Sequence, residues 1–230
     1  MQSKTTNQQK EIKRLDGSTV PFTHSEFVLE NKKVKILILG TRVTEKSIQA
    51  GYYYFGLSND ENCFWEVLRY CFNDSDFISK DVAKVKKALA SHNIVVSDLI
   101  YSCEYYGSED NETKKDSEKP NPDLIRLIEQ ADLVILNGGW NKKTKTGPLN
   151  YLHDKAFPIE QYIDKRSIKN KHEISETGII NINNHQARYI SLYSTSGSCA
   201  KKENFDTKTD FKKDFWKKHI DEALLRIKRQ

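Results

Sequence analysis

The chain is 230 residues long, with 37% hydrophobic residues, 30% charged residues and a formal net charge of +5. This length suits one domain with a sizeable core, and the hydrophobic content argues against an intrinsically disordered chain. No window approaches the roughly 18 consecutive apolar residues that a membrane-spanning helix needs, and the first residues lack the apolar core of a signal peptide. We therefore expect a cytoplasmic protein that does not act on a membrane, associated with the nucleoid if its source is bacterial.

We expect one domain preceded by a short extension. Residues 1–25 are polar and lack hydrophobic periodicity, which predicts an N-terminal extension. The remaining residues, 26–230, then form a single α/β domain.

The cysteines and histidines indicate no metal site. They show neither a CxxC pair nor metal-ligand spacing, so we expect no metal. We expect the histidines to be structural or surface residues; His185 is the first candidate for an exception, because it lies in a loop between two predicted strands that could face DNA. The thiols are expected to be reduced and mostly buried, at Cys63, Cys71, Cys103 and Cys199.

The first predicted element is a strand. The run VKILIL, residues 34–39, lies between Lys33 and Gly40, and its length and flanks are typical of a strand buried on both faces. The segment CFWEVLRYCF, residues 63–72, has apolar side chains at the i, i+3, i+4, i+7 spacing and predicts a helix. Residues 80–92 predict a second helix in the same way.

The second half continues this alternation. Asn121, Pro122 and Asp123 form a start signal for a helix that runs to residue 130. Three apolar runs then predict strands: DLVIL at 132–136, GIINI at 178–182 and YISLY at 189–193. Residues 211–230 place aromatic and aliphatic side chains on one side and predict an amphipathic helix.

Strands that alternate with helices predict an α/β fold whose central, largely parallel sheet is covered on both faces. In such folds, ligands bind beyond the carboxyl ends of the strands. We expect the loops that begin at Gly40, Asn137 and Ser194 to converge on one edge of the sheet, because each follows an apolar strand.

The last strand runs into the polar segment STSGS. This segment is either a plain surface turn or a loop that holds a phosphate, since small hydroxyls and backbone N–H groups approach a phosphate closely. Lys201 and Lys202 follow it, and a positive balance permits phosphate contacts but is also common in proteins that bind no nucleic acid. The segment consists of Ser194, Thr195, Ser196, Gly197 and Ser198.

Further polar and aromatic residues lie before the helix at 63–72. Asn62 precedes this helix directly, so its side chain is either a helix cap or a functional group. Tyr53 and Tyr54 are either packing residues or flat surfaces on which a ligand could stack.

Taken in order, six motifs resemble the uracil-DNA glycosylase superfamily, nearest the branch of mismatch-specific and hypoxanthine-DNA glycosylases. That branch has a strand ending in glycine, a YY pair, an N-x-F-W segment, a C-x-R-x-G-S-x-D segment, an N-G strand end and a final L-P-S-T-S loop. The corresponding residues here are Gly40, Tyr53 with Tyr54, Asn62 with Phe64 and Trp65, Cys103 to Asp110, Asn137 with Gly138, and Leu192 to Ser196.

The resemblance implies a three-layer α/β/α fold that binds double-stranded DNA as a monomer. It further implies that the enzyme flips one base out and hydrolyses its N-glycosidic bond, which leaves an abasic site and needs no cofactor. Asn62 would be the catalytic residue, and residues 194–198 with Lys201 and Lys202 would bind DNA. The substrate-binding residues would be Thr41, Arg42, Tyr53, Tyr54, Phe64 and Asn137.

Two departures from the family pattern leave the substrate open. The loop after the first strand reads TRVT, residues 41–44, where other branches have a catalytic Asn or Asp. Leu192 stands in place of the histidine of the uracil-specific enzymes, and Tyr193 in place of proline. These changes indicate either a different base or a lost activity.

The hypotheses that follow differ in class. A glycosylase with a changed base would act on hypoxanthine or on a modified cytosine of phage DNA, the latter with an antiviral defence role. An inactive glycosylase-like module would bind DNA tightly without releasing a base. An unrelated α/β hydrolase would prefer free nucleosides or nucleotides to DNA.

Overall fold

The structure is a computed structural model. It describes residues 10–13, 19–22, 34–42, 62–105, 114, 116–141, 147–154, 162–169, 173–195 and 208–228. In these ranges no helix combines the length and the apolar composition that crossing a membrane requires.

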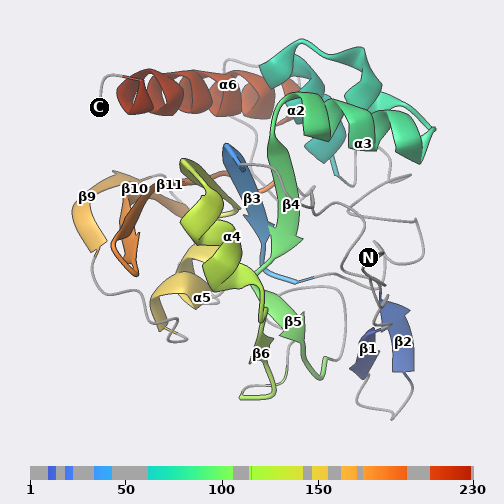
Figure 1. The fold of residues 1–230 in the computed structure, drawn as a ribbon, viewed down its shortest axis with the longest axis vertical. Helices are drawn as coiled ribbons and strands as arrows, with labels where there is room; N and C mark the ends of the chain where they lie inside the picture. The colour runs from blue at the N-terminus through green and yellow to red at the C-terminus, as the bar shows by residue number, and fades with distance from the viewer. Residues whose placement is uncertain are drawn as a thin grey trace, which may run out of the picture.

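The centre of the molecule is a mixed sheet that is mostly parallel (Figure 1). In the described residues it has seven strands, in the order β4-β3-β7-β11-β10-β8, with β9 on the free side of β10. Neighbours from β4 to β11 run parallel, and β10 is antiparallel to β11, β8 and β9. The bounds are β3 Ile36–Gly40, β4 Ile94–Asp98, β7 Leu133–Asn137, β8 Trp140–Asn141, β9 Tyr162–Lys169, β10 Glu173–Ile182 and β11 His185–Leu192.

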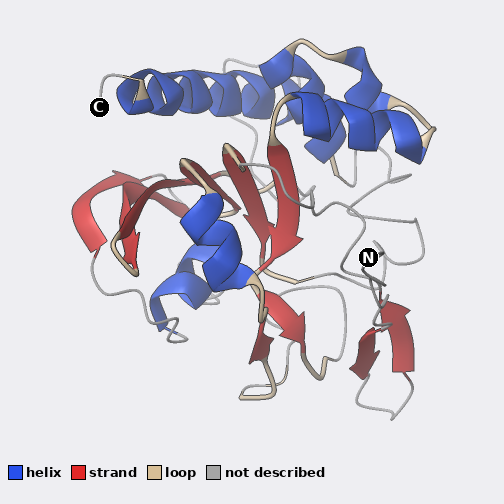
Figure 2. Cartoon of the chain, viewed as in Figure 1, coloured by secondary structure: helices blue, strands red, loops and turns tan. Residues whose placement is uncertain are grey.

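Helices cover both faces of this sheet (Figure 2). One hydrophobic cluster joins α2 (Phe64–Phe72), α3 (Val82–Ser91) and α6 (Lys208–Ile227) to one face. A second cluster joins α4 (Leu124–Gln130) and α5 (Pro148–Asp154) to the other face. The predicted three-layer α/β/α fold with a central, largely parallel sheet is therefore confirmed.

The alternation of side chains along β3 explains its unbroken apolar sequence. Ile36 and Ile38 lie in the cluster under α2, α3 and α6, and Leu37 and Leu39 lie in the cluster under α4 and α5. All four side chains are at most 1% exposed. Because successive residues of a strand point to opposite faces, a strand covered on both sides must be apolar at every position.

Strands β10 and β11 form a tight hairpin. Its two turn residues, Asn183 and Asn184, have φ values of 47° and 66°. Positive φ at both central residues is typical of a type I′ turn, whose twist matches that of the flanking strands. The predicted strands at 178–182 and 189–193 are thus confirmed as the C-terminal parts of two longer antiparallel neighbours, except that β11 ends at Leu192.

Two small two-stranded sheets lie outside the main sheet. The strands β1 (Lys10–Lys13) and β2 (Thr19–Phe22) pair inside the predicted N-terminal extension, and β5 (Ile100–Ser102) pairs with β6 (Lys119–Pro120). None of these four strands is predicted from the sequence, because each is too short to show a hydrophobic periodicity. The division into residues 1–25 and 26–230 stays a prediction.

Candidate functional site

Three strand ends meet at one edge of the sheet, as the sequence predicts. In the parallel register, Leu39 of β3 lies beside Leu136 of β7, and Asn137 lies beside Leu192 of β11. The backbone N–H of Gly138 donates to the carbonyl of Leu192 at 2.9 Å, which joins the loops that follow β7 and β11. His185, by contrast, begins β11 and lies at the opposite edge, where its Nε2 is 3.0 Å from the carbonyl oxygen of Ala131.

Asn137 and Thr195 form a reciprocal pair of hydrogen bonds, which we call the Asn137–Thr195 clasp. The Nδ2 of Asn137 donates to Thr195 Oγ1 at 3.0 Å, and the backbone N–H of Thr195 donates to Asn137 Oδ1 at 2.9 Å. The two side chains are 7% and 0% exposed. An amide has two donor hydrogens and two acceptor lone pairs, so half of the Asn137 capacity stays available for the predicted contact with a base.

Gly138 lets this edge pack closely. Its φ is 134°, and a Cβ at this position would lie 2.9 Å from the Cδ of Pro148, the first residue of α5. A side chain is therefore excluded both by backbone conformation and by space. This explains the glycine of the Asn-Gly strand end in terms of packing.

Asn62 lies against the same loop. Its Oδ1 accepts a hydrogen bond from the backbone N–H of Phe64, the first residue of α2, at 2.9 Å, and Asn62 lies one position before the N-cap residue Cys63. The next residue, Cys63, donates its backbone N–H to the Thr195 carbonyl at 3.1 Å and its thiol to the same oxygen at 3.4 Å. This bond at the helix start is of the kind that the cap interpretation predicts, and the functional role of Asn62 stays a prediction. Among the described residues Nδ2 of Asn62 has no hydrogen-bond partner, and the side chain is 7% exposed.

Arg42 and Phe64 are more deeply packed than a substrate contact requires. Arg42 is 4% exposed, and its guanidinium carbon lies 4.9 Å from the ring centroid of Tyr105. Phe64 is 1% exposed, with its ring edge-on to Trp65 and Trp216 at centroid distances of 4.9 and 6.4 Å. The ring of Phe64 is thus enclosed in the core, and its contact with a substrate stays a prediction.

Tyr193 anchors the start of the final loop on α6. Its ring is 1% exposed and stacks on Phe215, with centroids 4.4 Å apart. Its carbonyl accepts a hydrogen bond of 2.9 Å from the indole N–H of Trp216. Tyr193 is therefore a core residue that ties the end of β11 to α6.

Lys212 is a buried cation that is not among the predicted site residues. It is 2% exposed on α6. Burial raises the pKa of the nearby Cys63 thiol, and the positive charge of Lys212 opposes this rise. Lys212, Trp216 and Ile220 follow one another at intervals of four residues, so they lie on one face of the helix, and this face is buried.

The remaining predicted residues are only partly described. Thr41 follows β3, where its carbonyl accepts from the backbone N–H of Ile100 at 2.9 Å, and Ser194 is partly buried beside the clasp. The predicted residues that lie outside the described ranges are Tyr53, Tyr54, Ser196, Gly197, Ser198, Lys201 and Lys202.

The described residues include buried thiols but no cluster of metal ligands. In the described part of the chain, no three His, Cys, Asp or Glu side chains come together in a way that could hold a metal ion. Cys63, Cys71 and Cys103 are buried, as predicted, and form no disulfide, and Cys199 lies outside the described residues.

Replacing Thr195 by Val is expected to lower the free energy of unfolding by about 1–3 kcal/mol, because the buried Nδ2 of Asn137 then loses its acceptor while the side-chain shape is kept. Urea unfolding followed by circular dichroism measures the change. The Thr195→Ser variant keeps the hydroxyl and serves as the control. Equal losses in the two variants would show that the hydroxyl does not hold the loop.

Comparison with known proteins adds one structural likeness. No protein-family model matches the chain, and no curated protein matches its sequence. A solution NMR structure from Methanosarcina acetivorans, of a protein proposed to be a uracil DNA glycosylase, is 16% identical and has a TM-score of 0.49. The match covers 83% of this chain and 93% of that chain. At this identity and TM-score, the likeness lends this chain neither an activity nor a substrate.

Proposed function

We propose that the protein is a DNA glycosylase that flips a base out of double-stranded DNA and hydrolyses its N-glycosidic bond. The observation that carries the proposal is the hydrogen-bonded meeting of Asn62–Cys63, Asn137 and Thr195 at the carboxyl edge of the sheet. These segments belong to three of the motifs that resemble the uracil-DNA glycosylase superfamily. Ligands of open α/β sheets bind at this edge.

In the proposed reaction, water replaces the base at the sugar. The bond between C1′ and the base nitrogen breaks, the oxygen of water bonds to C1′, and a proton of the water goes to the departing base. Positive charge develops on the sugar and negative charge on the base, so fixed polar groups at both ends lower the barrier. The Nδ2 amide of Asn62 is the proposed group that orients the water or the flipped nucleotide.

The loop at residues 194–198 is proposed to hold the DNA backbone. Thr195 is fully buried in the clasp, so its part is to fix the loop, and the phosphate contacts fall to the neighbouring backbone N–H groups and small hydroxyls. Lys201 and Lys202 follow in the sequence and would add charge. Binding of this kind weakens steeply as salt rises.

The proposed substrate is a base other than uracil. The TRVT sequence at residues 41–44 and the burial of Arg42 support a pocket that differs from that of the uracil-specific enzymes. Hypoxanthine and modified cytosines of phage DNA are the candidates, the second with a role in antiviral defence. A monofunctional reaction is proposed because Lys212, the buried lysine near Asn62–Cys63, is too enclosed to attack a sugar carbon.

Mass spectrometry of bases released from genomic DNAs of different modification state tests the proposal without assuming a substrate. We expect one class of base to be released and an equal amount of abasic sites to appear. Duplexes that carry uracil, hypoxanthine or a modified cytosine then identify the substrate. The absence of any released base and of abasic sites from all these DNAs would contradict the proposal.

A DNA-binding module without catalytic activity is the second candidate. It is favoured by the capping role of Asn62 and by the enclosed ring of Phe64, since each can be explained by structure alone. Such a module would bind duplex DNA in a salt-sensitive manner without releasing a base during long incubation. Catalytic turnover on any of the DNAs above would exclude it.

A further inference from the structure

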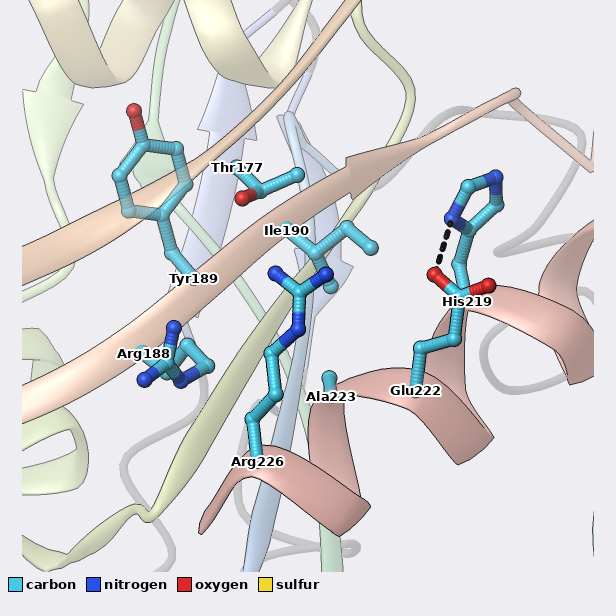
Figure 3. Close-up of a pocket in the computed structure, with 8 residues that line it drawn as sticks. All are labelled: Thr177, Arg188, Tyr189, Ile190, His219, Glu222, Ala223 and Arg226. Carbon is cyan, nitrogen blue, oxygen red and sulfur yellow. Dashed lines mark ion pairs between the residues drawn. The ribbon is translucent and has the colours of Figure 1, made fainter. Parts of the chain in front are cut away.

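A cavity of about 150 Å³ lies between the sheet and the C-terminal half of α6 (Figure 3). Its sheet wall includes Arg188, which pairs with Leu133, the first residue of β7. The Asn137–Thr195 clasp lies at the last residue of β7 and just beyond β11, whereas the cavity lies beside the middle of β11, at Arg188 and Ile190, and beside the start of β7. It is therefore separate from the candidate site, and an inference about it does not rest on the proposed glycosylase activity.

Two arginines from different elements line this cavity. Arg188 comes from β11, and Arg226 comes from the last turn of α6 and extends toward Ile190 in Figure 3. The ring of Tyr189 points away from them, toward the other face of the sheet, where its Cε1 would lie 2.6 Å from a Cβ on Gly178. On the face of β11 that is turned toward α6, the cavity is therefore lined by the two arginines and not by the ring of Tyr189.

The Arg188 guanidinium is incompletely satisfied. Its Nε is buried and has no hydrogen-bond partner in the structure. Within the described ranges, no carboxylate lies within ion-pair distance of Arg188 or of Arg226. Buried N–H groups of charged side chains are normally paired, and two positive charges on one small cavity repel each other unless an anion lies between them.

The other titratable groups of the cavity do not supply this anion. Glu222 is turned toward His219, with its Oε2 3.8 Å from the ring Nδ1. Burial lowers the pKa of His219, so the ring is neutral at neutral pH and can donate one hydrogen bond. The carbonyl end of α6 carries partial negative charge, so the attraction for an anion must come from the two guanidinium groups.

We propose that this cavity binds a phosphate group. The planar guanidinium fork donates parallel hydrogen bonds that match the oxygens of phosphate, and the cavity is lined by one arginine of the sheet, Arg188, and one of α6, Arg226. The cavity is smaller than the roughly 300–1,000 Å³ of sites for larger organic ligands. It therefore suits the phosphate itself, either as the free ion or as the end group of a nucleotide or a DNA strand.

Isothermal titration of inorganic phosphate into the full chain, at constant ionic strength, tests this proposal. We expect one phosphate per chain and an affinity at least about 10-fold lower in both Arg226→Gln and Arg188→Gln, since each removes one charged fork. Arg226 is an exposed residue, so its variant should fold even if Arg188→Gln does not. Arg126→Gln is the matched control, because Arg126 is an exposed residue of α4, on the other face of the sheet, 3.5 Å from Asp123.

Three competition arms identify the source of the phosphate. Displacement by a duplex oligonucleotide would assign it to the DNA backbone, and tighter binding of deoxyadenosine 5′-monophosphate, without displacement by DNA, would assign it to a nucleotide. Binding of inorganic phosphate alone would assign it to the free ion. The proposal is overturned if the wild-type chain binds no phosphate, or if Arg126→Gln weakens binding as much as Arg226→Gln does.

Discussion

Replacing Trp216 by Ala is expected to lower the free energy of unfolding by about 3–5 kcal/mol, the largest stability effect of any variant considered for this chain. The indole is fully buried in the cluster between α6 and the sheet, and its ring lies edge-on to Phe64. Its removal leaves a large cavity and also leaves the carbonyl of Tyr193 without its 2.9 Å hydrogen bond. Urea unfolding followed by circular dichroism measures the loss.

Two further variants separate the causes of this loss. Leu225→Ala, on the same helix at a position that is 53% exposed, should change stability by less than about 0.5 kcal/mol. Trp216→Phe keeps an aromatic ring but loses the indole N–H, and it should fall between the two because one buried acceptor becomes unpaired. A Trp216→Ala loss as small as that of Leu225→Ala would contradict the packing of α6 on the sheet.

The parallel core of the fold could be predicted because its sequence pattern is local. A run such as VKILIL is apolar at every position only if both faces of the strand are covered, and this is what the alternating contacts of β3 show. The strand ends at Gly40 and Asn137 could be predicted for the same reason. Parallel strands place their carboxyl ends at one edge, so the meeting of these loops followed from the fold class.

Other parts of the fold depend on contacts that no short window contains. Strand β4, Ile94–Asp98, contains Ser97 and Asp98, which are buried with the help of Asn121: its Nδ2 donates to Ser97 Oγ at 3.0 Å and to the Asp98 carbonyl at 2.9 Å. The sequence indicates that Asn121 belongs to a helix start, and its role in the sheet becomes visible only when the residue is placed beside β4. The Asn183–Asn184 pair is a local signal of a hairpin turn. The strand predictions rested on apolar runs alone, so they did not include this turn.

The candidate site was predicted in position better than in detail. Asn62, Asn137 and Thr195 were each predicted to lie at the edge, and hydrogen bonds link their segments there. The deep burial of Arg42 and Tyr193 was not predicted, because each is enclosed by a residue far along the chain, Tyr105 and Phe215 respectively. Polar and aromatic residues in loops therefore cannot be sorted into ligand contacts and packing residues before their distant neighbours are known.

Replacing Asn62 by Ala is expected to reduce the single-turnover rate of base release by about 100-fold or more, because a fixed polar group at the reacting centre is removed. The same change removes the 2.9 Å cap on Phe64 and should cost about 0.5–2 kcal/mol of stability. Quantifying abasic sites with time, beside urea unfolding, gives both numbers from one preparation.

Two controls separate the chemical role of Asn62 from its cap. Asn62→Ser keeps an oxygen that can accept from the Phe64 N–H but has no amide, so it should keep most of the stability and still lose the activity. Asp81→Ala removes a comparable cap on α3, where Oδ1 accepts from Ala83 N–H at 2.9 Å, and should lower stability without changing base release. If Asn62→Ser releases base at the wild-type rate, Asn62 is a helix cap only, and the catalytic group must lie among the other residues of the edge.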